Sequence, residues 1–339
     1  MTILTSKSAS VRPGLSSWQN DIRQAVRTAD ELCRRLQLPP ELAVAASSGA
    51  GEFPVFVPPS FLRRMRIGDP SDPLLRQVLP VWAESQVVAG FSADPVDDSA
   101  AKLHSGVLQK YAGRALLITT GACAIHCRYC FRRHYPYEEA PHSEAAWDQA
   151  LSNIATDETI REVILSGGDP LMLVDERLAS LVQKIAAIPH VVRLRIHTRL
   201  PIMVPARVSA AMIRWLTESA LTPIVVIHAN HAQELDSEVE LALSRLQQAG
   251  VMLLNQAVLL RSVNDSVQAQ FELSERLVAM GVTPYYLHQL DRVAGAAQFE
   301  VPVDEGKQLI AELRARLPGY AIPRYVQEVA GEPNKVVLA

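Results

Sequence analysis

The sequence lacks the features that define several classes of protein. None of its apolar runs approaches the ~18 residues of a membrane-spanning helix, and its first residues carry no apolar stretch of the signal-peptide kind. Basic residues are not in excess, since 33 Lys and Arg stand against 36 Asp and Glu. Only 4 cysteines occur in 339 residues, too few for a disulfide framework in a chain of this size. These absences predict a cytoplasmic protein with no membrane or nucleic-acid partner.

The composition is that of a packed globular protein. Hydrophobic residues make up 48% of the chain and charged residues 20%, which argues against disorder. The length corresponds to about two domains, or to one barrel-sized domain with an extension. Residues 1–113 are interrupted by prolines between short apolar patterns of helical spacing, of which 18–36 is the clearest. We therefore expect a helical N-terminal extension over residues 1–113.

A different pattern begins at residue 114, where apolar, β-branched runs alternate with stretches of helical period. The expected strands are 115–120, 162–168, 191–198, 222–229, 251–260 and 282–290. The expected helices are 143–155, 175–187, 209–219, 234–249, 266–279 and 304–316. Near-continuous apolar strands separated by helices are typical of a parallel sheet covered by helices. The six units predict an α/β fold, a partial (β/α)6 barrel over residues 114–317.

Residues that start and stop helices stand at the borders of these stretches. Ser143, Asp175 and Ser209 precede helical patterns, where short polar side chains cap the first turn. Gly250 and Gly281 follow helical patterns, where a residue in the left-handed conformation commonly ends a helix. The borders therefore support the division into alternating strands and helices.

The ends of the expected strands are polar although the strand bodies are apolar. These ends carry Cys123–Cys130, Ser166–Asp169, His197–Arg199, His228–Asn230, Asn255–Gln256 and His288–Asp291. In parallel α/β folds the carboxyl ends of the strands meet at one edge, where ligands bind. The pattern predicts a cavity lined for a polar ligand.

The clearest chemical motif is a loop in which Cys123, Cys127 and Cys130 are spaced C-x3-C-x2-C. Three thiolates from one loop can bind three irons of a 4Fe–4S cluster, which leaves the fourth iron open to a small molecule. Two alternatives remain, a zinc site and buried structural cysteines. Zinc normally takes a fourth ligand close by, and His126 lies inside the loop rather than at zinc-finger spacing.

This loop, after the first strand of a six-unit βα pattern, resembles that of the radical S-adenosylmethionine superfamily. Tyr129 before the last cysteine also fits the loop of that family. The run Ser166, Gly167, Gly168 and Asp169 is similar to the family's glycine motif, which lets the amino group of S-adenosylmethionine approach the backbone. Taken alone, the two glycines could equally form an ordinary turn between a strand and a helix.

Roughly residues 75–339 resemble the lysine 2,3-aminomutase family. Members attach pyridoxal phosphate to a lysine in a glycine-rich turn, and the resemblance assigns this role to Lys335 in the segment 318–339. Here the turn reads Gly-Glu-Pro-Asn instead of a run of glycines, and outside this context Lys335 would be a solvated lysine.

The resemblance also implies further contacts with pyridoxal phosphate. Arg114 matches an arginine that holds the phosphate, with Tyr111 nearby, and a guanidinium suits a phosphate dianion. Asn255 and Gln256 match a segment beside the pyridine ring. The segment 228–231 matches another part of the family without a defined role.

For the substrate, the resemblance implies L-lysine. Arg132 matches the arginine that binds the α-carboxylate, and Asp291 matches one of two carboxylates that bind the ε-ammonium. The second is Glu328, where the family has aspartate. Paired carboxylates offset the desolvation of an ammonium group in a closed cavity. The implied reaction moves an amino group to the β-carbon by 5′-deoxyadenosyl radical chemistry.

Within the family, the short C-terminus and the GEPNK-type turn are most similar to bacterial members that make (R)-β-lysine for modification of elongation factor P. The partners implied are L-lysine, an electron donor of the flavodoxin or ferredoxin type, and elongation factor P with its ligase. A free-lysine aminomutase of catabolism or osmolyte synthesis, and a glutamate- or arginine-specific relative, are alternatives within the family. A non-catalytic iron–sulfur scaffold is the alternative from another class.

Overall fold

A computed structural model of the chain describes residues 17–49, 53–104, 106–139 and 143–339. The strands are β1 (Lys102–His104), β2 (Val107–Leu108), β3 (Arg114–Thr120), β4 (Glu162–Gly167), β5 (Arg193–Thr198), β6 (Thr222–His228), β7 (Met252–Val258), β8 (Thr283–His288), β9 (Arg324–Gln327) and β10 (Val336–Val337). They form one sheet in the order of the sequence.

Every neighbouring pair from β3 to β9 is parallel, whereas β1, β2 and β10 add antiparallel strands at the two edges. The edge strands β1 and β10 are not paired with each other in the described part of the chain. The predicted α/β fold with a partial barrel is therefore confirmed. Its strand bodies are buried because helices cover a parallel sheet, as the apolar runs require.

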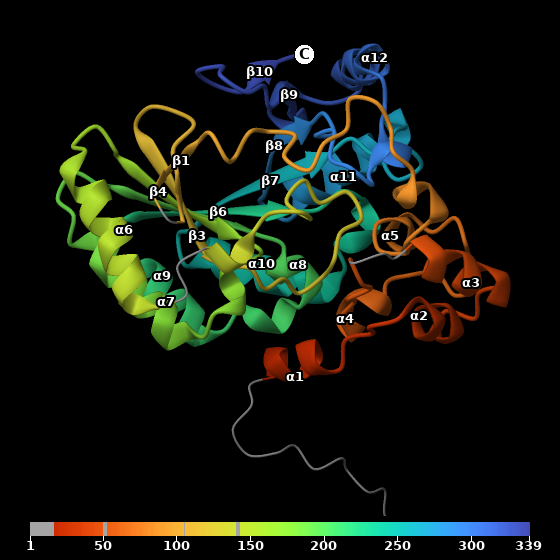
Figure 1. Ribbon diagram of the computed structural model, residues 1–339, viewed down its shortest axis with the longest axis horizontal. Coiled ribbons are helices and arrows are strands. Elements are labelled where there is room, and N and C mark those ends of the chain that lie inside the picture. The colour runs from red at the N-terminus through yellow and green to blue at the C-terminus, as the bar shows by residue number, and fades with distance from the viewer. Residues whose placement is uncertain (1–16, 50–52, 105, 140–142) are drawn as a thin grey trace, which may run out of the picture.

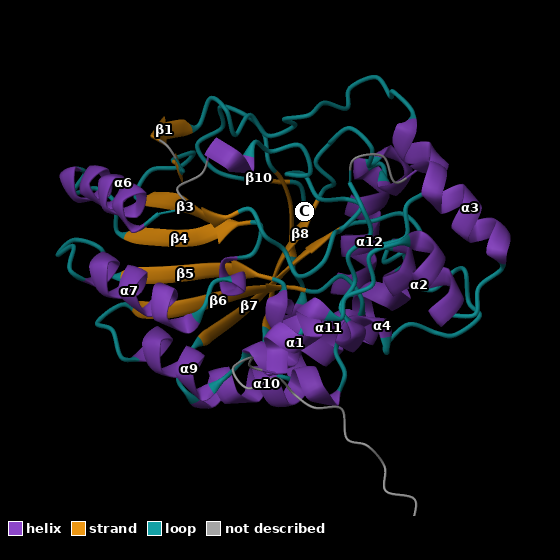
Figure 2. Cartoon of the chain, turned by 60° about the horizontal axis from the view of Figure 1, so that its bottom comes forward, coloured by secondary structure: helices purple, strands orange, loops and turns teal. Residues whose placement is uncertain are grey.

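The helices are α1 (Ser17–Arg23), α2 (Ala29–Arg35), α3 (Pro40–Gly49), α4 (Pro59–Leu62), α5 (Pro73–Arg76), α6 (Glu144–Thr156), α7 (Asp175–Ala186), α8 (Leu200–Met203), α9 (Ala210–Thr217), α10 (Ser237–Gln248), α11 (Val267–Ala279) and α12 (Val303–Arg314). Each of the six long helices predicted between or after the strands is present, as α6, α7, α9, α10, α11 and α12. Figure 2 shows α6, α7, α9 and α10 along the outer side of the strands. None of the helices within the described ranges combines the length and apolar character needed to cross a bilayer.

The predicted helix borders follow from local backbone chemistry. Ser143 and Ser209 each accept a hydrogen bond from the backbone N–H three residues on, as N-caps do. Gly250 and Gly281 have φ of 80° and 69°, in the left-handed region that favours glycine after a helix. Asp175 differs, because it is the first helical residue and its carboxylate binds side chains of a neighbouring segment.

The sheet continues beyond the six predicted strands at both ends. After α12, β9 pairs with β8 in parallel, and β10 folds back on β9. Tyr325 in β9 is fully buried, so this segment is part of the hydrophobic core. Figure 1 shows β9, β10 and the C-terminus beside α12. A strand of four residues is too short to show a periodic pattern in the sequence.

The described part of residues 1–113 carries helices α1 to α5 and packs on the barrel. Leu32, Phe61 and Leu74, from α2, α4 and α5, belong to the same buried cluster as the strands. The short strands β1 and β2 also lie within residues 1–113, and β2 pairs with β3. The division into an extension, a barrel and a C-terminal segment stays a prediction.

Candidate active site

A cavity of about 620 Å³ lies at the carboxyl ends of the parallel strands and reaches the C-terminal turn before β10. The residues that the sequence predicted for cluster, cofactor and substrate gather there from segments far apart in the chain. Those that line the cavity are Cys123, Cys127, Cys130, Tyr111, Arg114, Arg132, Ser166, Gly167, Gly168, Asp169, Gln256, Asp291, Glu328 and Lys335. The polar strand ends thus form one site.

Asn255 is the predicted residue that does not line this cavity. Its side chain accepts a hydrogen bond from the backbone N–H of Ala229 and donates one to the carbonyl of the same residue, at 2.9 and 3.1 Å. Successive residues of a strand point to opposite faces, so Gln256 faces the cavity and Asn255 does not. Asn255 instead joins the end of β6 to β7.

The cysteine loop is held against the glycine motif by backbone contacts. Gly168 donates its N–H to the carbonyl of Thr120 at 2.7 Å, and Asp169 donates to that of Ala122 at 2.8 Å. A Cβ atom on Gly168 would lie 2.4 Å from the Ala122 oxygen, and one on Gly167 would lie equally close to Thr120. Both glycines are therefore required by the close approach of the two loops.

Asp169 anchors a third strand end to the same place. Its buried carboxylate accepts hydrogen bonds from the Thr198 hydroxyl and from the backbone N–H groups of Arg199 and Leu200, at 2.7–3.0 Å. Burial raises the pKa of Asp169, and these hydrogen bonds oppose the rise. The loops after β3, β4 and β5 are thereby fixed relative to one another.

The three cysteines fit a cluster better than a single metal ion. Burial and the neighbouring thiols raise the pKa of Cys123 well above its usual range and that of Cys130 to about 11. Such thiols ionise when a cation binds them. In the described part of the chain no three His, Cys, Asp or Glu side chains are gathered closely enough to hold one metal ion. A cluster needs no such gathering, since each thiolate binds a separate iron.

A chain of alternating charges also lines the cavity. Arg132 pairs with Asp98 at 2.7 Å, and Asp98 pairs with Lys110 at 2.8 Å. Lys110 lies 3.6 Å from Glu328, which in turn forms an ion pair with Lys335. Glu328, predicted to bind an ammonium group, is thus already next to two of them.

The sequence analysis missed Asp98 and Lys110 in this chain of charges. Asp98 lies in a loop with Asp94 and Asp97, and no spacing in the sequence distinguishes it from them. It is 2% exposed, and Arg132 and Lys110 outweigh the effect of this burial, so its pKa is lowered. Only the fold reveals that it fixes Arg132.

Tyr111 and Arg114 line the same cavity as Lys335, and Tyr111 is linked to it through Glu328, an arrangement that suits a phosphorylated cofactor. The Tyr111 hydroxyl donates to Glu328 at 2.7 Å, and the Arg114 guanidinium carbon lies 4.7 Å from the centre of the Tyr111 ring. The buried Nε of Arg114 has no hydrogen-bond partner among the described residues. A phosphate group would supply that partner, so the residues present fit pyridoxal phosphate.

Asp291 is a buried carboxyl group close to both carboxylates and ammonium groups. Burial raises its pKa to about 7; Lys335 and Lys110 oppose the rise, and Glu328 and Asp98 add to it. A cationic ligand beside Asp291 would favour its ionised form. The site can therefore accept one more positive charge.

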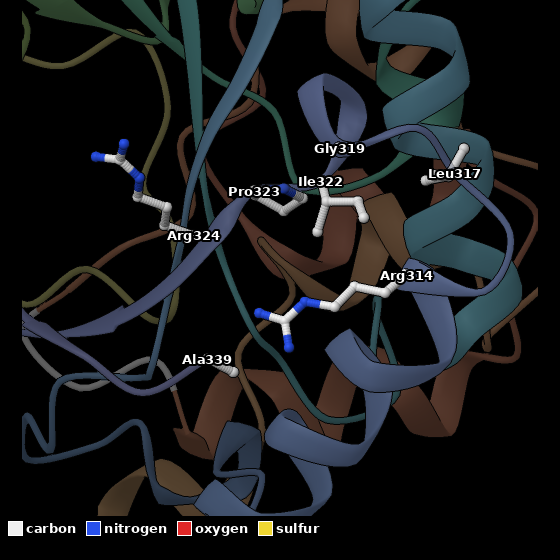
Figure 3. Close-up of a pocket in the computed structure, with 7 residues that line it drawn as sticks. All are labelled: Arg314, Leu317, Gly319, Ile322, Pro323, Arg324 and Ala339. Carbon is white, nitrogen blue, oxygen red and sulfur yellow. The ribbon is translucent and has the colours of Figure 1, made fainter.

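A second, smaller hollow of about 340 Å³ lies outside this site, between the end of α12 and the C-terminus (Figure 3). It is lined by Arg314, Leu317, Gly319, Ile322, Pro323, Arg324 and Ala339. None of the residues predicted for a functional site lines it.

Comparison with known proteins connects this geometry to a family. The chain matches the Radical SAM superfamily over residues 117–221, which span β3 to α9 and carry the cysteine loop. It is 45% identical to L-lysine 2,3-aminomutase of Escherichia coli, over 96% of this chain and 95% of that protein. Identity to the Haemophilus influenzae protein of the same name is 40%, over 95% and 96%. For the Clostridium subterminale protein it is 32%, over 94% and 77%.

Gly168→Ala is expected to displace the cysteine loop, because the new Cβ would collide with the Ala122 carbonyl. We expect a loss of about 1–3 kcal/mol in unfolding free energy and a fall in bound iron after reconstitution. Iron analysis and thermal unfolding measure both. Gly319→Ala is the control, since nothing lies within 4 Å of its added Cβ. Full iron content and an unchanged Tm in Gly168→Ala would contradict the packing argument.

Asp291→Asn is expected to change the pH dependence of stability. The pKa of Asp291 is about 7 in the folded protein and ~3.9 in the unfolded chain. The unfolding free energy of the wild type therefore falls as the pH rises between these values. The Tm of the variant relative to the wild type should therefore increase from about pH 5 to pH 7.5 and then level off. Asp157→Asn is the control, because hydrogen bonds from Thr159 lower the pKa of Asp157, and its Tm difference should be flat over that range. A flat difference for Asp291→Asn as well would refute the raised pKa.

Proposed function

The chain belongs to the lysine 2,3-aminomutase family of radical S-adenosylmethionine enzymes, and on this premise we propose that it converts L-lysine to (R)-β-lysine. It is an isomerase whose family uses a 4Fe–4S cluster, S-adenosylmethionine and pyridoxal phosphate. The finer parts of the proposal are the substrate, the stereochemistry of the product and the role of each residue. The substrate and the residue roles rest on the charges and contacts of the cavity, and the (R) configuration rests on the resemblance to the family.

When bound, the cofactors would supply the reactive chemistry. The cluster and S-adenosylmethionine would provide a carbon radical that takes a hydrogen atom, and pyridoxal phosphate would carry the migrating nitrogen. Cys123, Cys127 and Cys130 would hold the cluster, next to Ser166–Asp169 for S-adenosylmethionine. Lys335, Arg114 and Tyr111 would hold pyridoxal phosphate. The protein contributes binding, orientation and exclusion of water.

The observation that carries the proposal is that the cysteines and the chain of charges from Arg132 to Lys335 line one cavity. An amino acid with charges at both ends would span such a chain. This supports a diamino acid as substrate, because the cavity offers a guanidinium at one end and carboxyl groups at the other. A scaffold protein would need neither.

Arg132 is the proposed ligand of the α-carboxylate. It is 7% exposed, and its Nε is fixed by Asp98 while Nη1 donates to the Ser166 hydroxyl at 3.2 Å. A guanidinium held on one side by a carboxylate keeps a fixed orientation toward the cavity. Because Arg132 also bonds to Ser166, it would hold the α-carboxylate of the substrate next to the glycine motif.

Asp291 and Glu328 are the proposed ligands of the ε-ammonium group. Glu328 balances the charge of Lys335 in the structure, and it would be free to bind the substrate if Lys335 held pyridoxal phosphate. Asp291 is largely protonated below its pKa of about 7, so an incoming ammonium group would favour release of its proton. The two carboxyl groups then offset the desolvation of that ammonium group.

Three imidazoles, those of His197, His228 and His288, line the cavity. Burial lowers their pKa values well below the usual range, so they are neutral and add no charge to the site.

We also propose that the product serves in the cytoplasm to modify elongation factor P, through a ligase, and that a flavodoxin- or ferredoxin-type protein supplies electrons. Two comparisons support a place among the shorter bacterial members of the family, for which this role is proposed. Identity is higher to the Escherichia coli relative, 45% against 32% for the Clostridium subterminale relative. The chain spans 95% of the first and 77% of the second.

Anaerobic turnover of the reconstituted wild type with L-lysine, analysed on a chiral column, tests the proposed reaction, and (R)-β-lysine is the expected product. Lys335→Ala should lose this turnover and the absorbance of bound pyridoxal phosphate but keep its iron, because the nitrogen that seats the cofactor is gone. Lys307→Ala, on the exposed side of α12, is the control and should keep both. Release of another product by the wild type, or retained turnover in Lys335→Ala, would overturn the assignment.

Asp291→Asn should weaken the apparent affinity for lysine by roughly 10- to 100-fold, since a buried charge-assisted contact contributes about 1.5–3 kcal/mol. Arg132→Lys should also weaken it, because a planar fork becomes a point charge. Lysine titrations on protein with verified cofactor content measure both effects. Unchanged lysine affinity in Asp291→Asn would refute its role in binding the ammonium group.

A further inference from the structure

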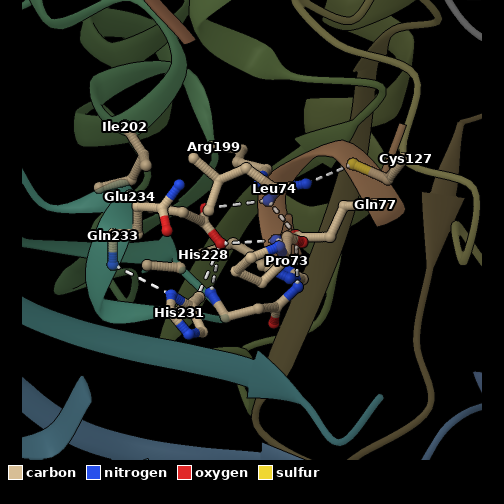
Figure 4. A network of polar contacts seen from close by, with 12 residues as sticks. Pro73, Leu74, Gln77, Cys127, Arg199, Ile202, His228, His231, Gln233 and Glu234 are labelled. Atoms are coloured by element: carbon tan, nitrogen blue, oxygen red, sulfur yellow. Dashed lines mark hydrogen bonds and ion pairs between the residues drawn. The ribbon is translucent and has the colours of Figure 1, made fainter. Parts of the chain in front are cut away.

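Arg199, directly after β5, makes a contact with the cysteine loop that the proposed reaction does not use. Its Nη1 donates a hydrogen bond to the sulfur of Cys127 at 2.7 Å. Its Nη2 donates to Gln77 at 2.6 Å and to Glu234 at 2.9 Å (Figure 4). The side chain is buried, and its Nε has no hydrogen-bond partner among the described residues. Arg199 thus donates hydrogen bonds both to side-chain oxygens and to the sulfur of Cys127.

The guanidinium keeps its charge in this buried position. A guanidinium is not deprotonated in proteins, and the Glu234 carboxylate at 2.9 Å offsets the cost of burying its charge. A full positive charge is therefore held at hydrogen-bond distance from one of the three expected cluster ligands. In a buried environment such a charge acts more strongly than it would in water.

A rigid polar frame holds the guanidinium in place. Gln77, Asn230 and Glu234 are each fully buried. Gln77 donates to Glu234 at 3.0 Å, and Asn230 donates to Gln77 through its side chain and to Glu234 through its backbone N–H, both also at 3.0 Å. Tyr129 accepts a further hydrogen bond from Asn230 at 2.7 Å. Because these groups satisfy one another, Arg199 has little freedom to turn away from Cys127.

The backbone of Arg199 is fixed as well. Its N–H donates to the Asp169 carboxylate at 2.7 Å, and Asp169 also bonds to the cysteine loop through Ala122. The position of Arg199 relative to that loop is therefore set from both ends, by backbone and side chain.

We propose that Arg199 is a positioning residue that sets the reduction potential of the cluster through its hydrogen bond to the Cys127 sulfur. Hydrogen bonds and positive charge at a cluster sulfur favour the reduced state, because reduction adds one negative charge to the cluster. Gln77 and Glu234 hold the donor, and Glu234 moderates its charge. The inference depends on the cluster alone and holds whichever amino acid is the substrate.

The test is the midpoint potential of the reconstituted cluster, measured by redox titration with electron paramagnetic resonance, without lysine or S-adenosylmethionine. Replacing both partners, Arg199→Gln with Glu234→Gln, avoids leaving an unpaired buried carboxylate. The potential of this double variant should become more negative, because the lost positive charge is the closer of the two to sulfur. Arg199→Lys keeps the charge without the fork and should give a smaller shift in the same direction.

Glu234→Gln alone should shift the potential the opposite way, to more positive values, because the charge of Arg199 is then no longer balanced. The matched control is Arg64→Gln. The side chain of Arg64 is also buried and donates to the carbonyl of Glu234 at 3.2 Å, but its hydrogen bonds within the described residues go to oxygen atoms and not to sulfur. Its loss should therefore leave the potential unchanged.

Iron and sulfide contents, measured on every variant, separate a change in potential from loss of the cluster. An unchanged potential in a fully loaded double variant would overturn the proposal, as would an equal shift in Arg64→Gln. If the double variant does not retain the cluster, opposite shifts in Arg199→Lys and Glu234→Gln support the proposal. The absence of a shift in both would reject it. Turnover of lysine enters none of these readings, so failure of the proposed function remains distinguishable.

Discussion

The buried carboxylate of Asp169 is the constraint on which the rest of the site depends. The backbone N–H of Asp169 bonds to the cysteine loop after β3, and its carboxylate bonds to Thr198 and to the start of the segment after β5. A buried carboxylate is costly unless hydrogen bonds satisfy it, so its partners are bound to fixed positions. The glycine next to it completes the arrangement, since any larger residue would push the two loops apart.

Two polar networks contact the loops that Asp169 joins. One runs from Arg199 through Glu234 and Gln77 and surrounds one side of the cysteine loop. The other runs from Arg132 through Asp98 toward Lys335, with alternating charges. Both are largely buried, so each charge is balanced by a partner instead of by water. In the roles proposed above, the first network acts on the electron that enters the site, and the second on the amino acid that reacts there.

The two networks also differ in how far sequence reasoning could anticipate them. The resemblance to a family pointed to Arg132, Asp291 and Glu328, yet Asp98 carries no local signal that separates it from its neighbours in the loop. Asn255 and Gln256 were expected together, but the alternation of a strand turns them to opposite faces. Contacts such as that of Arg199 with Cys127 join residues 72 positions apart, and no periodic pattern reports them.

The sequence by itself determined the alternating strands and helices, their capped ends and the cysteine loop, because these depend on neighbours within a few residues. Apolar runs of six or seven residues and helices of about two to three turns carry enough of a periodic signal to be read directly. The tertiary structure alone decided that β9 joins the sheet, that Asp98 and Lys110 connect Arg132 with Glu328, and that Arg199 lies against Cys127. These contacts arise only when the strand ends meet at one edge, and there burial compels each polar group to find a partner.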